Sequence, residues 1–172
     1  ERLANPLDEN TINLAEISKK RNKTLDDHRL LSKIEFVGGI YHDPKIGPVV
    51  PNKWLLKMIQ EGATKEKKGK AMLSAVFIEK EEIKLIYEGP TEIDKLYEEG
   101  FFDQRCIGVN QSKTVRTRPR FNEWSLVFEL EYDETLVDAV NIKRALEYGG
   151  KGKGIGDYRP RFGTFVLEAF NE

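Results

Sequence analysis

The chain has 172 residues, of which 39% are hydrophobic and 33% are charged, and this length and composition suit one domain with an extension. Its 28 basic and 29 acidic residues leave a net charge of -1, which argues against a general polycation. No apolar run is long enough to span a membrane, and no signal peptide is visible. A single cysteine, Cys106, excludes an internal disulfide and a Cys-based zinc site. We therefore expect a cytoplasmic protein without a membrane partner, bound metal or cofactor.

The first third of the chain predicts an arm, a strand and a helix. Residues 1–32 are polar and weakly patterned, which favours an N-terminal arm with short helices. In residues 33–41, Ile34 and Phe36 would face one way and Glu35 and Val37 the other before a Gly-Gly pair, which predicts a strand with a bulge. A loop follows, and Pro51 with the apolar spacing of residues 54–59 predicts a helix that ends at Gly62.

The middle third predicts two strands, a short helix and a basic insertion. Residues 71–78 are apolar on both faces, which is typical of a central strand, and residues 83–87 would form a hairpin with it. Thr91 resembles a helix cap, so we expect a helix over residues 91–99. Residues 101–121 have no sustained period and predict a hairpin or loop.

The last third predicts strand, helix and strand. Residues 124–132 alternate cleanly, which favours a strand. Asp138 would cap a helix that ends at residues 149–150, and a glycine-rich loop then leads into a strand over residues 163–170.

The order of these elements gives the expected fold class. Two βαβ halves would form an α+β, ferredoxin-like fold, an antiparallel sheet with helices on one face. It would be a single domain over residues 33–172, with the basic insertion at about residues 100–123. The other sheet face would be open to a ligand, as in the RNA-recognition motif.

Charge is concentrated in the insertion. Residues 104–120 contain no acid and five basic side chains. These are Arg105, Lys113, Arg116, Arg118 and Arg120. In a strand the last three would point the same way about 7 Å apart, close to the phosphate repeat of an extended strand. Alternatively, the insertion is a solvated hairpin whose arginines pair with Glu129, Glu131 or Asp133.

A second candidate site is the loop GGKGKGIGDYRPRFGTF at residues 149–165. Accessible glycine amides with cationic side chains can form a phosphate cradle, and aromatic rings can stack on bases. The candidate residues are Lys151, Gly152, Lys153, Gly154, Gly156, Tyr158, Arg159, Arg161 and Phe162. A dinucleotide loop follows a strand rather than a helix, and a P-loop needs Gly-Lys-Ser/Thr, so both are excluded. Alternatively, the glycines only form caps and turns in a flexible connection.

The spacing of Gly154, Gly156, Gly163 and Phe165 before the last predicted strand carries a family resemblance. The pattern G-x-G-x-x-x-x-x-x-G-x-F resembles the hallmark loop of the repeat-associated (RAMP) RNA-binding superfamily of CRISPR systems. The segments RTRPRFNEW and GIGDYRPRFGTF also resemble a group of small bacteriophage proteins. The resemblance covers mainly the C-terminal third. It implies binding of RNA or single-stranded nucleic acid, with the loop against the backbone and the insertion acting as a thumb. The cytoplasm would be that of a bacterial host if a phage encodes the chain.

Catalysis is the weaker hypothesis. Some members of that superfamily are metal-independent endoribonucleases with a histidine near this position, which suggests His42 as general acid or base, assisted by Tyr41 or Lys53. The alternating carboxylates at residues 129–133 resemble the solvent face of a strand more than a Mg²⁺ site.

The sequence favours a non-enzymatic protein that binds RNA or single-stranded DNA. Its expected partners include copies of itself or other subunits of a nucleoprotein complex, repeated along a strand. One alternative is an endoribonuclease that uses His42. The other is an assembly subunit without nucleic acid, in which the acidic strand of one copy meets the basic arm of the next.

Overall fold

The computed structural model describes residues 2–109 and 112–171. Over these residues the chain is a mixed α+β protein with six α-helices and small antiparallel sheets. In the same residues no helix is both long enough and apolar enough to cross a membrane.

The chain forms two compact units, each built from separate stretches of sequence. The first unit comprises Glu1–Val49 and Lys84–Ser125, and the second comprises Val50–Ile83 and Leu126–Glu172. The expected division into an arm at residues 1–32 and one domain over residues 33–172 stays a prediction beside these two units.

Helices form the N-terminal part of the first unit: the 3-10 helix η1 (Arg2–Ala4), α1 (Glu9–Ser18) and α2 (Leu25–Gly39). A capping box starts α2, because Thr24 Oγ1 accepts from Asp27 N at 3.2 Å and Asp27 Oδ2 accepts from Thr24 N at 2.9 Å. Helix α2 runs through residue 32, so the N-terminal segment is continuous with the rest of the unit.

The strand prediction over residues 33–41 is wrong, because most of this segment belongs to α2. Ser32, Glu35 and Phe36 are buried at helical spacing, and two of the three are polar. An apolar pattern alone therefore does not reveal this helix. Phe36 anchors the core of the first unit together with Ile40 and Leu96.

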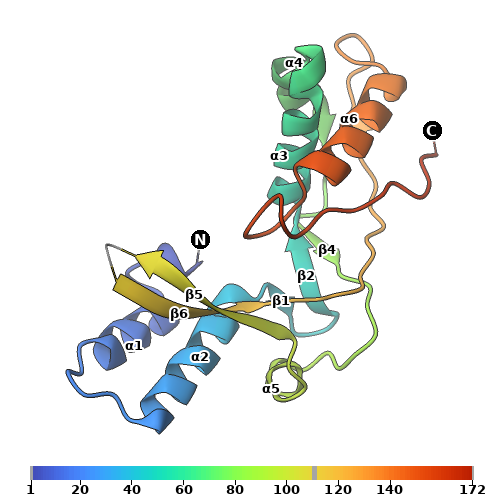
Figure 1. Cartoon of the computed structure of the whole chain (residues 1–172). Coiled ribbons are helices and arrows are strands. Elements are labelled where there is room, and N and C mark those ends of the chain that lie inside the picture. The colour runs from blue at the N-terminus through green and yellow to red at the C-terminus, as the bar shows by residue number, and fades with distance from the viewer. Residues whose placement is uncertain (1, 110–111, 172) are drawn as a thin grey trace. The chain divides into compact units, whose positions relative to one another are not determined.

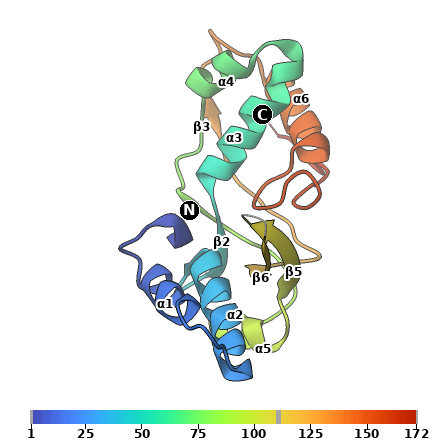
Figure 2. The same ribbon diagram turned by 60° about the vertical axis from the view of Figure 1, so that its left-hand side comes forward.

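The insertion is the antiparallel hairpin of β5 (Phe102–Val109) and β6 (Ser112–Pro119), which confirms the hairpin prediction. Its expected turn includes Asn110 and Gln111, which lie outside the described residues. The hairpin lies beside α2 in both ribbon views (Figures 1 and 2). The predicted short helix is also confirmed as α5 (Ile93–Glu98).

A three-stranded sheet has the order β1-β2-β4. Strand β1 (His42–Asp43) pairs antiparallel with β2 (Gly47–Pro51), and β4 is Glu82–Lys84. The expected strand over residues 83–87 is thus only partly present, and it is extended by an isolated bridge between Ile86 and Ser125.

The second unit contains α3 (Asn52–Gly62), the 3-10 helix η2 (Ala63–Glu66), α4 (Gly69–Ala75) and α6 (Ala139–Gly152). These helices gather in one part of Figure 2. The predictions of α3 and α6 are confirmed, although α6 continues to Gly152 instead of ending at residues 149–150.

The strand prediction for residues 71–78 is mostly wrong, because α4 takes up its first part and β3 covers only Val76–Phe77. Met72 is buried whereas Leu73 is largely exposed, as expected for one buried helix face. A short apolar run fits either a buried strand or a helix, and here the helix forms.

The two strands predicted near the C-terminus are largely absent from the described residues. Within residues 124–132 only β7 (Glu131–Tyr132) forms, paired with β3, and residues 163–170 form no strand. Half-buried and exposed side chains still alternate along residues 124–132. The apolar pattern therefore predicts correctly which side chains are packed, although most of this segment forms no ladder of backbone hydrogen bonds. The sheets are small and separate, and a ferredoxin-like arrangement is not confirmed.

Candidate nucleic-acid interface

The β5–β6 hairpin gathers arginines on one face. Its register places Arg105 opposite Arg116 and Asp103 opposite Arg118. Because side chains alternate along a strand, these four residues share a face. Arg120 follows β6 and reaches the same face, since its Nη1 lies 3.5 Å from Asp103 Oδ1. We call Arg105, Arg116, Arg118 and Arg120 the arginine face.

Asp103 is the acidic residue within this hairpin. Its Oδ1 accepts from Arg105 Nη2 at 2.7 Å, and Arg105 Nε donates to its Oδ2. These hydrogen bonds from Arg105, with the nearby charge of Arg120, hold the pKa of Asp103 below its usual value. One carboxylate therefore serves two arginines.

Glu35 provides a second carboxylate, from α2. It is 4% exposed, its Oε1 accepts from Arg116 Nη1, and its Oε2 accepts from the backbone N–H of Thr117 at 2.7 Å. A buried carboxylate is stable only where hydrogen-bond donors satisfy it, and both donors to Glu35 come from β6. These two contacts therefore hold the hairpin on α2.

Next to Glu35, hydroxyl and amide groups complete the contact between α2 and the hairpin. Ser32 Oγ lies 3.0 Å from Thr117 Oγ1, 2.9 Å from Tyr97 Oη and 2.7 Å from Gln104 Nε2. A serine hydroxyl has two acceptor sites and one donor, so three partners use its full capacity. The hairpin is therefore held in a defined position on α2.

The structure brings Arg116, Arg118 and Arg120 together on one face, as the alternate spacing predicts. Lys113 lies on the other face, because it has the same parity along β6 as the buried Thr117. Arg118 Nη1 donates to the carbonyl oxygen of Thr117 at 3.2 Å.

Among the described residues Arg116 pairs with Glu35, and Arg105 and Arg120 pair with Asp103, instead of the expected Glu129, Glu131 or Asp133. The three expected carboxylates belong to the second unit. Asp133 accepts from the hydroxyl and backbone N–H of Thr135, which lowers its pKa. Sequence reasoning left Glu35 and Asp103 out of the site and did not place Arg105 opposite Arg116, since only the register and the α2 contact reveal these positions.

The glycine loop, in the second unit, is closed at its base. Ile155 N donates to the carbonyl oxygen of Gly163 at 2.9 Å, and Gly154 N donates to that of Gly149 at 2.8 Å. Gly163 has φ +71°, and a Cβ there would lie 1.8 Å from the Ile155 carbonyl oxygen. These glycines serve chain closure, and the amides of Gly154 and Ile155 are used within the loop.

The loop side chains divide into engaged and exposed groups. Arg159 Nη1 and Nη2 lie 3.1 and 3.4 Å from the two carboxylate oxygens of Glu61 on α3. Tyr158 is 50% exposed, and its ring centroid lies 5.8 Å from that of Phe162.

Three further cations remain exposed on or beside the loop, namely Lys151, Lys153 and Arg161. Within the described part of the chain they form no ion pair. The neighbouring Gly152 is the last residue of α6, and its Cβ position is open. Gly156 takes φ +81° beside Trp54. The loop therefore presents lysines and an arginine at its surface while its glycines shape the backbone.

His42 is held by a structural contact. Its Nε2 lies 2.6 Å from the carbonyl oxygen of Thr91, a geometry in which the ring N–H donates. Tyr41 is in the same unit, whereas Lys53 belongs to the second unit. Among the described side chains, no group of three or more His, Cys, Asp or Glu residues is placed to hold a metal ion.

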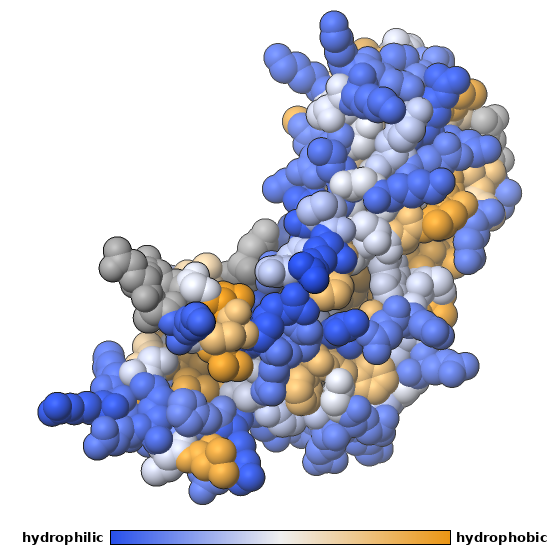
Figure 3. Space-filling model, in the orientation of Figure 1, coloured by the Kyte–Doolittle hydropathy of each residue, from blue (hydrophilic) through white to orange (hydrophobic). Residues whose placement is uncertain are grey.

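Most of the surface visible in Figure 3 is hydrophilic, with hydrophobic side chains in separate patches. Comparisons of the chain with protein-family models, with curated proteins and with solved structures find no match, so the resemblance to the RAMP superfamily stays a prediction.

Proposed function

We propose that this chain binds RNA or single-stranded DNA, without cleaving it, through the arginine face. The observation that carries the proposal is the position of Arg105 directly opposite Arg116 in the β5–β6 ladder. Like charges opposite each other in a sheet are destabilising. Asp103 and Glu35 offset part of this repulsion, but residues 102–120 still contain five basic side chains and one acid. A phosphate backbone would interact favourably with this local excess of basic side chains.

The geometry favours a single strand over a duplex. Alternate residues of a strand repeat at about 7 Å, which is close to the phosphate spacing of an extended polynucleotide. The exposed Lys151, Lys153 and Arg161 and the ring of Tyr158 offer a separate contact area in the second unit. Such proteins combine cationic grooves with aromatic stacking. A bound strand would contact the arginine face without needing the continuous sheet face of a ferredoxin-like fold, and further copies of the chain could follow along it.

Binding without cleavage is favoured over the endoribonuclease alternative. The contact of His42 Nε2 with the Thr91 carbonyl leaves only Nδ1 to take a proton from a 2′-hydroxyl, and Lys53, the residue expected to assist, belongs to the second unit. The natural chain should therefore leave bound RNA intact, and replacement of His42 by Ala should leave the RNA affinity unchanged.

Fluorescence polarisation with a labelled single-stranded RNA, a single-stranded DNA and a duplex of the same sequence tests the proposal. The double variant Arg118→Gln/Arg120→Gln should weaken single-strand binding by at least about tenfold. The matched control is Arg21→Gln/Arg29→Gln, which removes the same charge from the same unit outside the hairpin. Equal losses in both double variants, or tighter binding of duplex, would contradict the proposal.

A further inference from the structure

Helices α3 and α6 of the second unit touch at backbone distance. A Cβ on Gly62 would lie 2.1 Å from the carbonyl oxygen of Ala145, and one on Gly149 would lie 2.3 Å from Met58 Sδ. Each helix therefore has a glycine at the point of close contact with the other helix, where a larger side chain would clash. Side chains close to these glycines converge on a common space.

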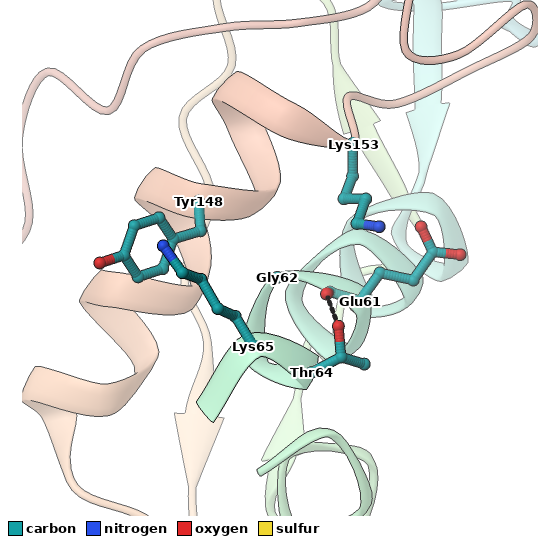
Figure 4. A pocket seen from close by; sticks show the side chains of 6 residues that line it. All are labelled: Glu61, Gly62, Thr64, Lys65, Tyr148 and Lys153. Carbon is teal, nitrogen blue, oxygen red and sulfur yellow. Dashed lines mark hydrogen bonds between the residues drawn. The ribbon is translucent and has the colours of Figure 1, made fainter. Parts of the chain in front are cut away.

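That space is a pocket near the C-terminal ends of both helices, lined by Glu61, Gly62, Thr64, Lys65, Tyr148 and Lys153. Figure 4 shows Lys65 reaching from η2 to the ring of Tyr148, while Lys153 descends from the end of α6 on the side of Glu61. Lys65 Nζ lies 4.6 Å from the ring centroid, and Tyr148 is 44% exposed. The pocket thus combines two ammonium groups with one accessible aromatic ring.

The pocket is positively charged even though Glu61 lines it. Both carboxylate oxygens of Glu61 face the guanidinium of Arg159, at 3.1 and 3.4 Å. This ion pair offsets the one negative charge, so the charges of Lys65 and Lys153 remain. In the described part of the chain neither lysine has a carboxylate partner.

We propose that this pocket binds one nucleotide unit, with the phosphate between Lys65 and Lys153 and the base against Tyr148. An ammonium group is a strong point donor to phosphate, and a tyrosine ring stacks on any base. The proposal rests on the proposed function in that the nucleotide may belong to a bound strand, but Lys65 and Tyr148 lie outside the arginine face. The other source of the same chemistry is a free mononucleotide.

If Lys65 and Lys153 only stabilise the helices, their replacement should affect stability and not nucleotide binding. Cations near helix C-termini stabilise the helix dipole, and both lysines lie at such ends. In that case Lys65→Gln would lower the melting temperature and leave nucleotide affinity unchanged.

Calorimetric titration of the full chain with 5′-AMP, adenosine and inorganic phosphate, and with a single-stranded oligoadenylate, separates these possibilities. We expect 5′-AMP to bind more tightly than adenosine or phosphate, and Lys65→Gln to weaken it by at least about fivefold. Tyr148→Leu should remove the advantage of 5′-AMP over phosphate. Lys70→Gln on α4 is the matched control and should change neither.

The two sources and the two proposals give different outcomes. Lys65-dependent binding of 5′-AMP supports a free nucleotide as ligand, and Lys65-dependent binding of the oligoadenylate alone supports a nucleotide of a strand. Oligoadenylate binding that ignores Lys65→Gln, without 5′-AMP binding, overturns the pocket and leaves the arginine face intact. Binding of 5′-AMP without binding of any strand contradicts only the proposed function.

Discussion

Arg105 and Arg116 are direct cross-strand neighbours in the β5–β6 ladder, so two guanidinium groups start from adjacent positions of one sheet face. Each is drawn to a different carboxylate, Arg105 to Asp103 within the hairpin and Arg116 to Glu35 on α2. The divergence limits their mutual repulsion and ties the hairpin to the helix beneath it. The charge of the hairpin and its position on α2 are therefore linked.

Replacement of Glu35 by Gln tests that link. Gln has one acceptor oxygen for these two donors, so its NH₂ would face either the Arg116 guanidinium or the Thr117 N–H, and the buried site would lose its negative charge. We expect the free energy of unfolding of the first unit to fall by about 1.5–3 kcal/mol in urea denaturation.

The control for Glu35→Gln is Asp26→Asn, on the same helix. Asp26 lies 3.2 Å from Arg29, and both side chains are largely exposed, so its loss should cost less than about 1 kcal/mol. Similar costs for the two variants would show that Glu35 does not anchor the hairpin.

Gly163 is required for closure of the glycine loop. Alanine there would combine φ +71° with a Cβ 1.8 Å from the Ile155 carbonyl oxygen. We expect Gly163→Ala to destabilise the second unit by about 2 kcal/mol or more and to increase amide exchange at Ile155. Gly152→Ala, where nothing lies within 4 Å of the new Cβ, should be neutral or slightly stabilising because it adds a helix-forming residue. Equal effects of the two alanines would argue against a closed loop.

Asp27 makes the first unit sensitive to acid. Its hydrogen bond with Lys20 (2.6 Å), together with the Thr24 backbone N–H, lowers its pKa from 3.8 to about 2. A carboxyl group whose pKa is lower in the folded state contributes stability above the unfolded value, and this is lost as pH falls from about 4 towards 2.

Urea denaturation between pH 5 and 2 checks this sign. The difference in free energy of unfolding between the natural chain and Asp27→Asn should shrink as the pH falls. In a chain that already carries Lys20→Met, Asp27→Asn should change the free energy of unfolding less at pH 5, because Asp27 has lost its lysine partner. An NMR titration that places the carboxyl pKa of Asp27 at or above 3.8 would remove the basis for this expectation.

Sequence reasoning succeeds where one local signal is enough. The helical spacing after Pro51 predicts α3, Asp138 marks the start of α6, and the basic insertion is a hairpin. Within the hairpin, alternation also places Arg116 and Arg118 on one face.

Sequence reasoning fails where contacts between distant parts of the chain determine the secondary structure or the partner of a side chain. Helix α2 buries Glu35 and Ser32, so its buried face is too polar for an apolar pattern to find. The run over residues 71–78 fits strand or helix equally, and its packing selects α4. The partners of the arginines depend on the β5–β6 register and on the contact with α2, neither of which is written in a local pattern.

The salt dependence of single-strand binding tests the central claim most directly. Neutralised phosphates release counterions, so the logarithm of the binding constant should fall with the logarithm of salt concentration at about -0.7 per phosphate contact. We predict a clear negative slope for single-stranded RNA, made shallower by Arg118→Gln/Arg120→Gln and unchanged by Arg21→Gln/Arg29→Gln. A slope that both double variants leave unchanged, or no binding at low salt, would contradict the account.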